Sequence, residues 1–157
     1  MKIELWYIGK NAFPFVEDGM KIFEKRIKRY NPFEIVCIQD VKSGKKIESK
    51  TIMANEARKI LTKLTKDDFV IILDENGKIY GSKSFSEQVN TWLQISKKRL
   101  IFLVGGAFGF DQSIYDRSNV QLSLSKMTFS HQLIRLIFLE QLYRGFTILR
   151  NEKYHNE

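Results

Sequence analysis

The 157-residue sequence predicts an α/β fold: one domain, residues 1–157, with a mainly parallel sheet flanked by helices. Short apolar, β-prone segments alternate with amphipathic helical segments along the chain. Residues 69–73 are apolar without a break, which is typical of parallel strands covered on both faces. Neither repeats nor linker-like stretches interrupt this alternation, so the sequence predicts a single unit.

The first expected strand spans residues 2–8 and ends at Gly9. A helix with a basic outer face follows, because apolar side chains recur at steps of four and three: Val16, Met20, Phe23, Ile27 and Tyr30. Asn31-Pro32 ends this helix, since proline cannot continue it. Residues 33–39 form the second expected strand, and Cys37 within it is expected to be an inert core residue.

The middle of the chain begins with a polar, lysine-rich loop at residues 41–50. A solvated loop and a contact with RNA phosphates are equally compatible with this sequence. A second amphipathic helix, marked by apolar residues between 53 and 64, precedes a strand at 68–73. Residues 74–78 are expected to form a turn centred on Asn76-Gly77. Ser84 and Glu87 have the spacing of a capping box, which predicts a helix with Ser84 as its N-cap.

The C-terminal part begins with a strand at 99–104 that ends at Gly105-Gly106. A short helix at 112–116, an extended piece at 120–124 and a last helix at 130–145 are expected to follow. The last helix is apolar on nearly every side, so it must be buried on two faces. We expect a homodimer centred on this helix; the alternative is a central helix wrapped by its own domain.

The composition restricts the partners. A net charge of +8 favours a polyanion such as nucleic acid, although many small basic proteins bind nothing acidic. No apolar run reaches the roughly 20 residues that span a bilayer, and the N-terminus lacks a signal-peptide pattern. We therefore expect a cytoplasmic protein with no membrane partner. One cysteine and two histidines make a disulfide or a metal site unexpected.

The strongest local signal for a ligand is the strand-then-glycine sequence FLVGGAFG at residues 102–109. It has neither the Rossmann nor the P-loop spacing, so a structural turn and a ligand site remain equally open. The loop at 122–129 could enclose an adenine or be an ordinary loop before a helix with Ser130 as its N-cap. Taken alone, His131 is expected to bond locally and His155 to lie in a frayed tail.

Three segments in order resemble the SPOUT superfamily of knotted methyltransferases: VIILD at 70–74, FLVGGAFG at 102–109 and LSLSKMTFSHQLIR at 122–135. The resemblance is closer still to the type H large-subunit ribosomal RNA methyltransferases. It covers the whole chain, including EQLYRG at 140–145 and the terminal Tyr154-His155.

This resemblance implies a deep trefoil knot in the C-terminal half, a topology otherwise rare. It implies S-adenosylmethionine as cofactor, bound near the dimer interface, and methylation of N3 of a pseudouridine in 23S ribosomal RNA on the assembled ribosome. The implied cofactor contacts are Leu73, Gly105, Leu124, Ser125, Lys126, Met127, Thr128 and Phe129.

The same resemblance suggests the residues for catalysis. We expect Arg144 to stabilise developing negative charge, with Tyr154 and His155 closing over the target nucleotide and His155 accepting the proton. The alternative for Arg144 is a partner of the helix C-terminus. Lys153 stands where the family commonly has proline, which puts the exact role of the tail in doubt.

Two other functional classes remain open at this point. One is a non-catalytic, basic RNA-binding or ribosome-associated factor, which needs neither a cofactor nor the glycine segment. The other is a flavodoxin-like nucleotide-binding regulator, although the sequence shows no phosphate-cradling loop.

Overall fold

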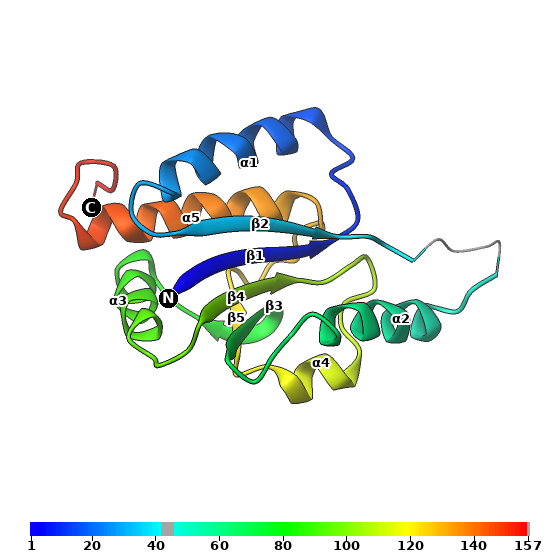
Figure 1. The fold of residues 1–157 in the computed structure, drawn as a ribbon. Helices are drawn as coiled ribbons and strands as arrows, with labels where there is room; N and C mark the ends of the chain where they lie inside the picture. Colours follow the sequence, from blue (N-terminus) through cyan, green and yellow to red (C-terminus); the bar gives the residue numbers. More distant parts are fainter. Residues whose placement is uncertain (42–45, 157) are drawn as a thin grey trace.

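The computed structural model, which describes residues 1–41 and 46–156, contains one five-stranded sheet in the order β2-β1-β4-β3-β5 (Figure 1). All pairs of neighbouring strands are parallel, as the sequence predicts. The strands are β1 (Lys2–Ile8), β2 (Phe33–Ile38), β3 (Asp68–Ile79), β4 (Arg99–Val104) and β5 (Val120–Ser123). The helices are α1 (Pro14–Ile27), α2 (Ser49–Leu61), α3 (Ser82–Leu93), α4 (Gln112–Arg117) and α5 (Leu133–Leu149).

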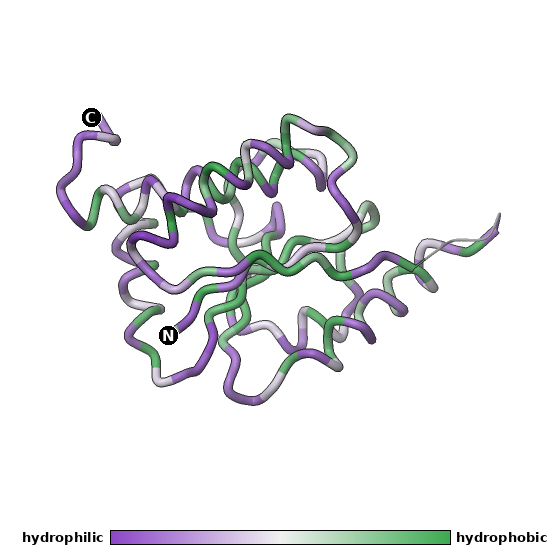
Figure 2. The backbone as a smooth tube through the Cα atoms, turned by 45° about the horizontal axis from the view of Figure 1, so that its top comes forward, coloured by the Kyte–Doolittle hydropathy of each residue, from purple (hydrophilic) through white to green (hydrophobic). Residues whose placement is uncertain are grey.

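Helices cover both faces of the sheet. One face packs against α1, α3 and α5, and the other against α2 and α4 (Figure 1). Side chains of β1 alternate between these layers: Ile3 and Leu5 face the first, and Trp6 and Ile8 face the second. The hydrophobic colouring of the backbone accordingly concentrates in the central strands (Figure 2).

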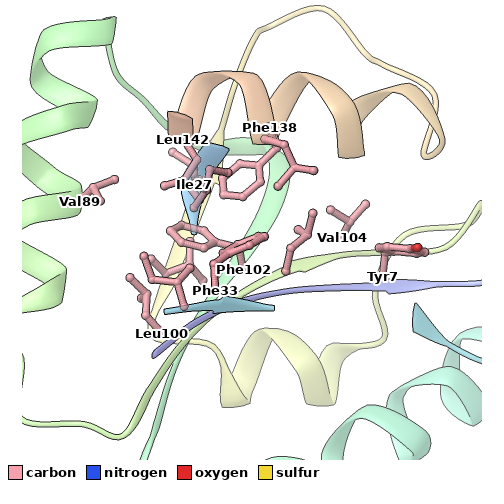
Figure 3. Close-up of a cluster of buried hydrophobic side chains, with 14 of the residues drawn as sticks. Tyr7, Ile27, Phe33, Val89, Leu100, Phe102, Val104, Phe138 and Leu142 are labelled. Carbon is pink, nitrogen blue, oxygen red and sulfur yellow. The ribbon is translucent and has the colours of Figure 1, made fainter. Parts of the chain in front are cut away.

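The larger core lies between β4 and α5. Phe102 on β4 contacts Phe138 on α5, with ring centroids 4.6 Å apart (Figure 3). Val89 on α3 and Leu142 on α5 close the same cluster from the side. This core fixes α5 above the central strands, and α5 in turn carries residues of the candidate site.

The last helix is longer than expected and begins later. It ends at Leu149, and Ser130 precedes it, where the Ser130 hydroxyl accepts the Leu133 N–H at 3.1 Å. Its flanks pack against α1 and α3 of its own chain. A Cβ on Gly19 of α1 would lie 2.7 Å from Leu136, so glycine permits this close approach. Own-chain packing thus covers much of α5, while Leu133 stays exposed.

Two expectations at β3 and α3 were wrong. The turn expected at residues 74–78 does not end the strand: β3 continues to Ile79 along β5, with a local Asx hydrogen bond from the Asn76 N–H to Asp74 Oδ1 at 2.8 Å. The register shifts there instead, and Leu73 and Lys78 both pair with Leu122. The capping box is also absent: α3 begins at Ser82 after Gly81, and the Ser84 hydroxyl donates to the Gly81 carbonyl.

The prediction that Cys37 is a core residue was also wrong. Cys37 is exposed, because β2 is an edge strand that pairs with β1 alone. The partial burial of the Cys37 side chain nevertheless raises the pKa of its thiol. The loop expected at residues 41–50 is shorter, because α2 already begins at Ser49. Residues 42–45 of that expected RNA contact lie outside the described residues.

A charged cluster closes the amino-terminal edge of the sheet. Arg99 on β4 donates two hydrogen bonds of 2.7 Å to Asp68 on β3. Glu4 on β1 accepts a hydrogen bond from the Trp6 indole at 2.7 Å and lies 3.4 Å from Arg99. Glu4 and Asp68 are buried, so their pairing with Arg99 is what makes their burial tolerable.

Candidate active site

The carboxyl ends of β3, β4 and β5 border a cleft of about 640 Å³. The strands are parallel, so the segments that follow them meet at one edge of the sheet and leave a concave site there. A volume in this range suits a small-molecule ligand or cofactor. The lining comprises residues 73–76, 104–110, 115, 122–125, 127–131 and 134.

The glycine turn after β4 forms one wall of the cleft. Gly109 has a φ of +82°, a conformation that side chains with a Cβ rarely adopt, and its N–H donates to the Gly106 carbonyl at 3.2 Å. A Cβ on Gly105 would lie 3.3 Å from the Phe110 ring. Glycine is therefore favoured at 109 by the backbone conformation, and a side chain at 105 would require the Phe110 ring to shift by a few tenths of an ångström.

The segment after β5 forms the opposite wall through short-range hydrogen bonds. The Ser123 hydroxyl donates to the Ser125 carbonyl at 2.8 Å, and the Ser125 hydroxyl accepts the Met127 N–H at 2.9 Å. The Thr128 hydroxyl donates to the Glu75 carboxylate at 2.7 Å, which ties this segment to β3. Met127 projects an apolar side chain that is 77% exposed.

The residues expected to contact a cofactor lie together in this cleft, with one exception. Lys126 is exposed and does not contribute to the lining. The residues that do are Leu73, Gly105, Leu124, Ser125, Met127, Thr128 and Phe129.

Two carboxylates and one histidine add polar chemistry to the lining. Asp74 and Glu75 come from β3, and the Tyr115 hydroxyl donates to Asp74. Burial and this hydrogen bond raise the pKa of Tyr115 to about 12, so its hydroxyl stays protonated. His131 lines the cleft beside the start of α5, where burial, with a contribution from Arg135, lowers its pKa. The imidazole is therefore neutral at pH 7.

A buried arginine fixes the start of α5 against the end of β1. Arg135 is 0% exposed, and its guanidinium donates to the carbonyls of Ile8 and Gly9 and to Asn11 Oδ1, at 2.7, 3.1 and 2.9 Å. It also lies 4.2 Å from the Tyr7 ring centroid. Burial lowers the pKa of Arg135. These contacts hold the turn of α5 that contributes to the cleft.

The residues expected to serve catalysis form a second cluster around Glu140. Its carboxylate accepts a hydrogen bond from the Tyr154 hydroxyl at 3.0 Å and another from Arg144. Arg144 Nη1 lies 3.3 Å from His155 Nδ1, and the guanidinium lies 4.8 Å from the Tyr154 ring centroid. Burial and the Glu140 contact raise the pKa of Tyr154. The tail therefore packs on α5.

The two clusters lie at opposite ends of α5. Ile134 lines the cleft, and Arg144 lies 10 positions further along the same helix (144 − 134). At a rise of about 1.5 Å per residue this separates them by roughly 15 Å along the helix axis. Within one chain, the tail and the cleft do not form a common site.

Sequence reasoning missed three residues that organise these clusters. Glu140 could have been found, because Glu140 and Arg144 have the i, i+4 spacing of a helical ion pair. Arg135 had a weaker signal, a cation within the most apolar stretch of the last helix. Glu56, a buried carboxylate directed at Gly106, had none, because its contact depends on the packing of α2 against the glycine turn.

Two kinds of feature are absent from residues 1–41 and 46–156. No helix in these ranges is long and apolar enough to cross a membrane. No group of three or more His, Cys, Asp or Glu side chains among them is arranged to hold a metal ion.

Comparisons with known proteins identify relatives along the whole chain. Residues 1–155 match a family model described as "Predicted SPOUT methyltransferase". Proteins named "Ribosomal RNA large subunit methyltransferase H" from Christiangramia forsetii and Flavobacterium johnsoniae are 46% and 43% identical, over 99% and 100% of both chains. A solved structure of a probable methylase family protein from Haemophilus influenzae shares the fold with a TM-score of 0.53. It is 12% identical, and the match covers 99% of this chain and 70% of that one.

Proposed function

The chain belongs to the SPOUT methyltransferase family, and from that membership we propose that it uses S-adenosylmethionine to methylate N3 of a pseudouridine in 23S ribosomal RNA on the assembled ribosome. The observation that carries the proposal is the full-length similarity to relatives named for methylating the RNA of the large ribosomal subunit. The cleft supports it, because it gathers the expected cofactor residues apart from Lys126.

The residues of the cleft fit S-adenosylmethionine. Leu124 and Phe129 offer apolar surface for an adenine ring, and the turn at Gly105 leaves backbone groups free to bond polar edges. The carboxylates of Asp74 and Glu75 suit hydroxyl or ammonium donors. When bound, the cofactor supplies a methyl group already activated by the positive sulfonium, so the protein mainly has to align the acceptor nitrogen.

We assign the chemistry at the acceptor to the tail cluster. Arg144 brings a cation that stabilises negative charge as the imide loses its N3 proton. Tyr154 and His155 close over the nucleotide, and His155 accepts the proton directly or through water. Without substrate, Nδ1 of His155 faces Arg144. His155 must therefore leave this contact and turn to the nucleotide before it can accept the proton.

A homodimer brings the two clusters together. The cleft and the tail lie at opposite ends of α5, so a two-fold axis across this helix places the tail of one subunit near the cleft of the other. Exposed Leu133 and the aromatic pair Phe13–Phe15, with ring centroids 5.5 Å apart, provide apolar surface near the start of α5 for such contact. The implied C-terminal knot belongs to the same proposal.

The basic surface accounts for RNA affinity. A net charge of +8 attracts the phosphate backbone, and an outer face of α1 rich in lysine contributes to it. Binding of ribosomal RNA is therefore expected to weaken steeply as salt increases. A ribosomal substrate also places the protein in the cytoplasm.

The direct test is transfer of labelled methyl from S-adenosylmethionine to ribosomes that lack this modification, with free 23S RNA in parallel. We expect label at one pseudouridine, on ribosomes only. Absence of label on both substrates, from a preparation shown to be folded, would contradict the proposal and favour a non-catalytic RNA-binding factor.

A second test separates the tail from the cleft. Arg144→Ala is expected to lower turnover by 100-fold or more, on the order of the loss of one positioned donor, while the affinity for S-adenosylhomocysteine is unchanged. Mixing this variant with a Gly105→Val variant should restore part of the activity, because mixed dimers contain one intact pairing of tail and cleft. Equal loss of turnover and cofactor affinity in Arg144→Ala would overturn the assignment.

A further inference from the structure

A carboxylate is buried behind the glycine turn, on the side away from the cleft. Glu56 is only 8% exposed and lies on the face of α2 that packs toward the sheet, next to Ala57 and near Ile60. Among the described residues, none forms a hydrogen bond or ion pair with its carboxylate. The carboxylate oxygens keep some contact with solvent, but a largely buried carboxylate with no cationic partner is unusual.

The carboxylate of Glu56 is directed at Gly106. A Cβ built on Gly106 would lie 2.8 Å from both Oε1 and Oε2 of Glu56, so the two oxygens occupy the space that a side chain would need. Gly106 also lines the cleft. The backbone of a single glycine thus separates this carboxylate from a ligand in the cleft.

The charged groups around Glu56 leave it without compensation. Lys59 on the same helix donates its ammonium hydrogens to the carbonyls of Gln39 and Asp40, not to Glu56. The turn at 105–110 contains no charged side chain. Burial raises the pKa of Glu56, the carboxylate of Asp40 adds to this, and Lys59 opposes it. A cation in the cleft would favour the ionised form.

We propose that Glu56 is the counter-charge for a cationic ligand in the cleft, and that it makes the site prefer the positively charged sulfonium cofactor to its neutral thioether product. This inference rests on the proposed function, since that function supplies the cofactor. S-adenosylmethionine carries one positive charge more than S-adenosylhomocysteine. A fixed negative charge behind the glycine turn therefore acts on the first ligand and hardly on the second.

The proposal has a consequence for protons. When the cation enters, the ionised form of Glu56 is stabilised, and the proton held by the neutral fraction passes to the solvent. The neutral product removes no proton in this way. Loss of the positive charge on methyl transfer also weakens the hold of the site on its product.

The first experiment is titration calorimetry of the full-length wild-type protein with each ligand at about pH 5, close to the ordinary pKa of glutamate, where a carboxyl group with a raised pKa is partly protonated. Running it in two buffers of different ionisation enthalpy gives the number of protons released. We expect release with S-adenosylmethionine and less with S-adenosylhomocysteine. Equal proton release by the two ligands overturns the proposal.

The second experiment compares Glu56→Gln with Glu48→Gln, which removes the same charge from an exposed position two turns away at the start of α2. Glu56→Gln is expected to weaken S-adenosylmethionine binding about tenfold and S-adenosylhomocysteine binding less than about twofold. Glu48→Gln should change neither. The thermal midpoint of each variant verifies folding.

The outcomes separate the two proposals. A wild-type protein that binds neither ligand refutes the proposed function, and this inference with it. Normal binding by the wild type, with both affinities lowered equally or both unchanged in Glu56→Gln, leaves the proposed function intact and refutes the role of Glu56.

Discussion

Replacing Arg135 by methionine tests whether the buried guanidinium holds the first turns of α5 in place. The change keeps most of the side-chain volume, so little of its effect comes from a cavity. It removes the donors for three acceptors: the buried carbonyl of Ile8, and the partly buried carbonyl of Gly9 and Oδ1 of Asn11. The stacking of the cation on Tyr7 is lost as well.

The expected magnitude follows from these contacts. Three fully buried acceptors without donors would cost about 3–9 kcal/mol in total, and the cost here lies toward the lower end because two of the three are only partly buried. Relief from the desolvation of the guanidinium offsets part of this. We therefore expect Arg135→Met to lower the free energy of unfolding by about 3 kcal/mol, mostly through the lost hydrogen bonds.

The assay is urea unfolding followed by circular dichroism, with S-adenosylhomocysteine binding measured on the folded variant. Arg150→Met is the matched control, because Arg150 is exposed at the other end of α5. It should change stability by less than about 0.5 kcal/mol. A stability of Arg135→Met within the same margin of the wild type would refute the reasoning, because it would mean that the three acceptors do not depend on this side chain.

Two further predictions concern the sheet. Gly77→Ala places a Cβ 2.6 Å from the backbone nitrogen of Leu122, so we expect a loss of about 1–3 kcal/mol in thermal unfolding, against little change for Gly81→Ala. Burial alone would raise the pKa of Asp68, but hydrogen bonds from Arg99 and Thr65 bring it below the ordinary value. The pairing of Asp68 with Arg99 contributes its full stability above the pKa that Asp68 has in the unfolded chain. This contribution is lost as the pH falls through the lower pKa that Asp68 has in the folded protein. In urea unfolding at pH 2–5, Asp68→Asn should flatten the acid loss of stability; an unchanged pH profile would contradict this.

The order of elements and the parallel sheet could be predicted, because both depend on local patterns. Alternating strands and helices predict an α/β sheet, whereas the glycine pair directly after a strand left a structural turn and a ligand site equally open. The strand order β2-β1-β4-β3-β5 could not be predicted, since residues distant in sequence decide which strands are neighbours. For the same reason Cys37 was assigned to the core: its own segment is apolar, and its exposure comes from the edge position of β2.

The candidate site, like the fold, could be predicted only in part. Apart from Lys126, the residues that the resemblance selected lie in one cleft and one tail cluster, but it did not indicate that roughly 15 Å of α5 separates the two. Nor could it select Glu56 or Arg135, whose roles arise from contacts between elements far apart in the chain. Asn76-Gly77 did mark an irregularity in the backbone, but pairing with β5 turned it into a register shift.

The strands β3 and β4 diverge at their carboxyl ends, and this divergence affects how the cleft would respond to substitutions of its lining. The two strands pair only as far as Leu73 and Val104, after which β3 follows β5 alone. We infer that the course of the backbone creates the cavity, and we expect the cavity to persist when lining side chains are exchanged. If the cleft binds the proposed sulfonium cofactor, shortening Leu124 or Phe129 offers a route to enzymes that accept bulkier sulfonium analogues, because such changes enlarge an existing opening without rearranging the sheet that creates it.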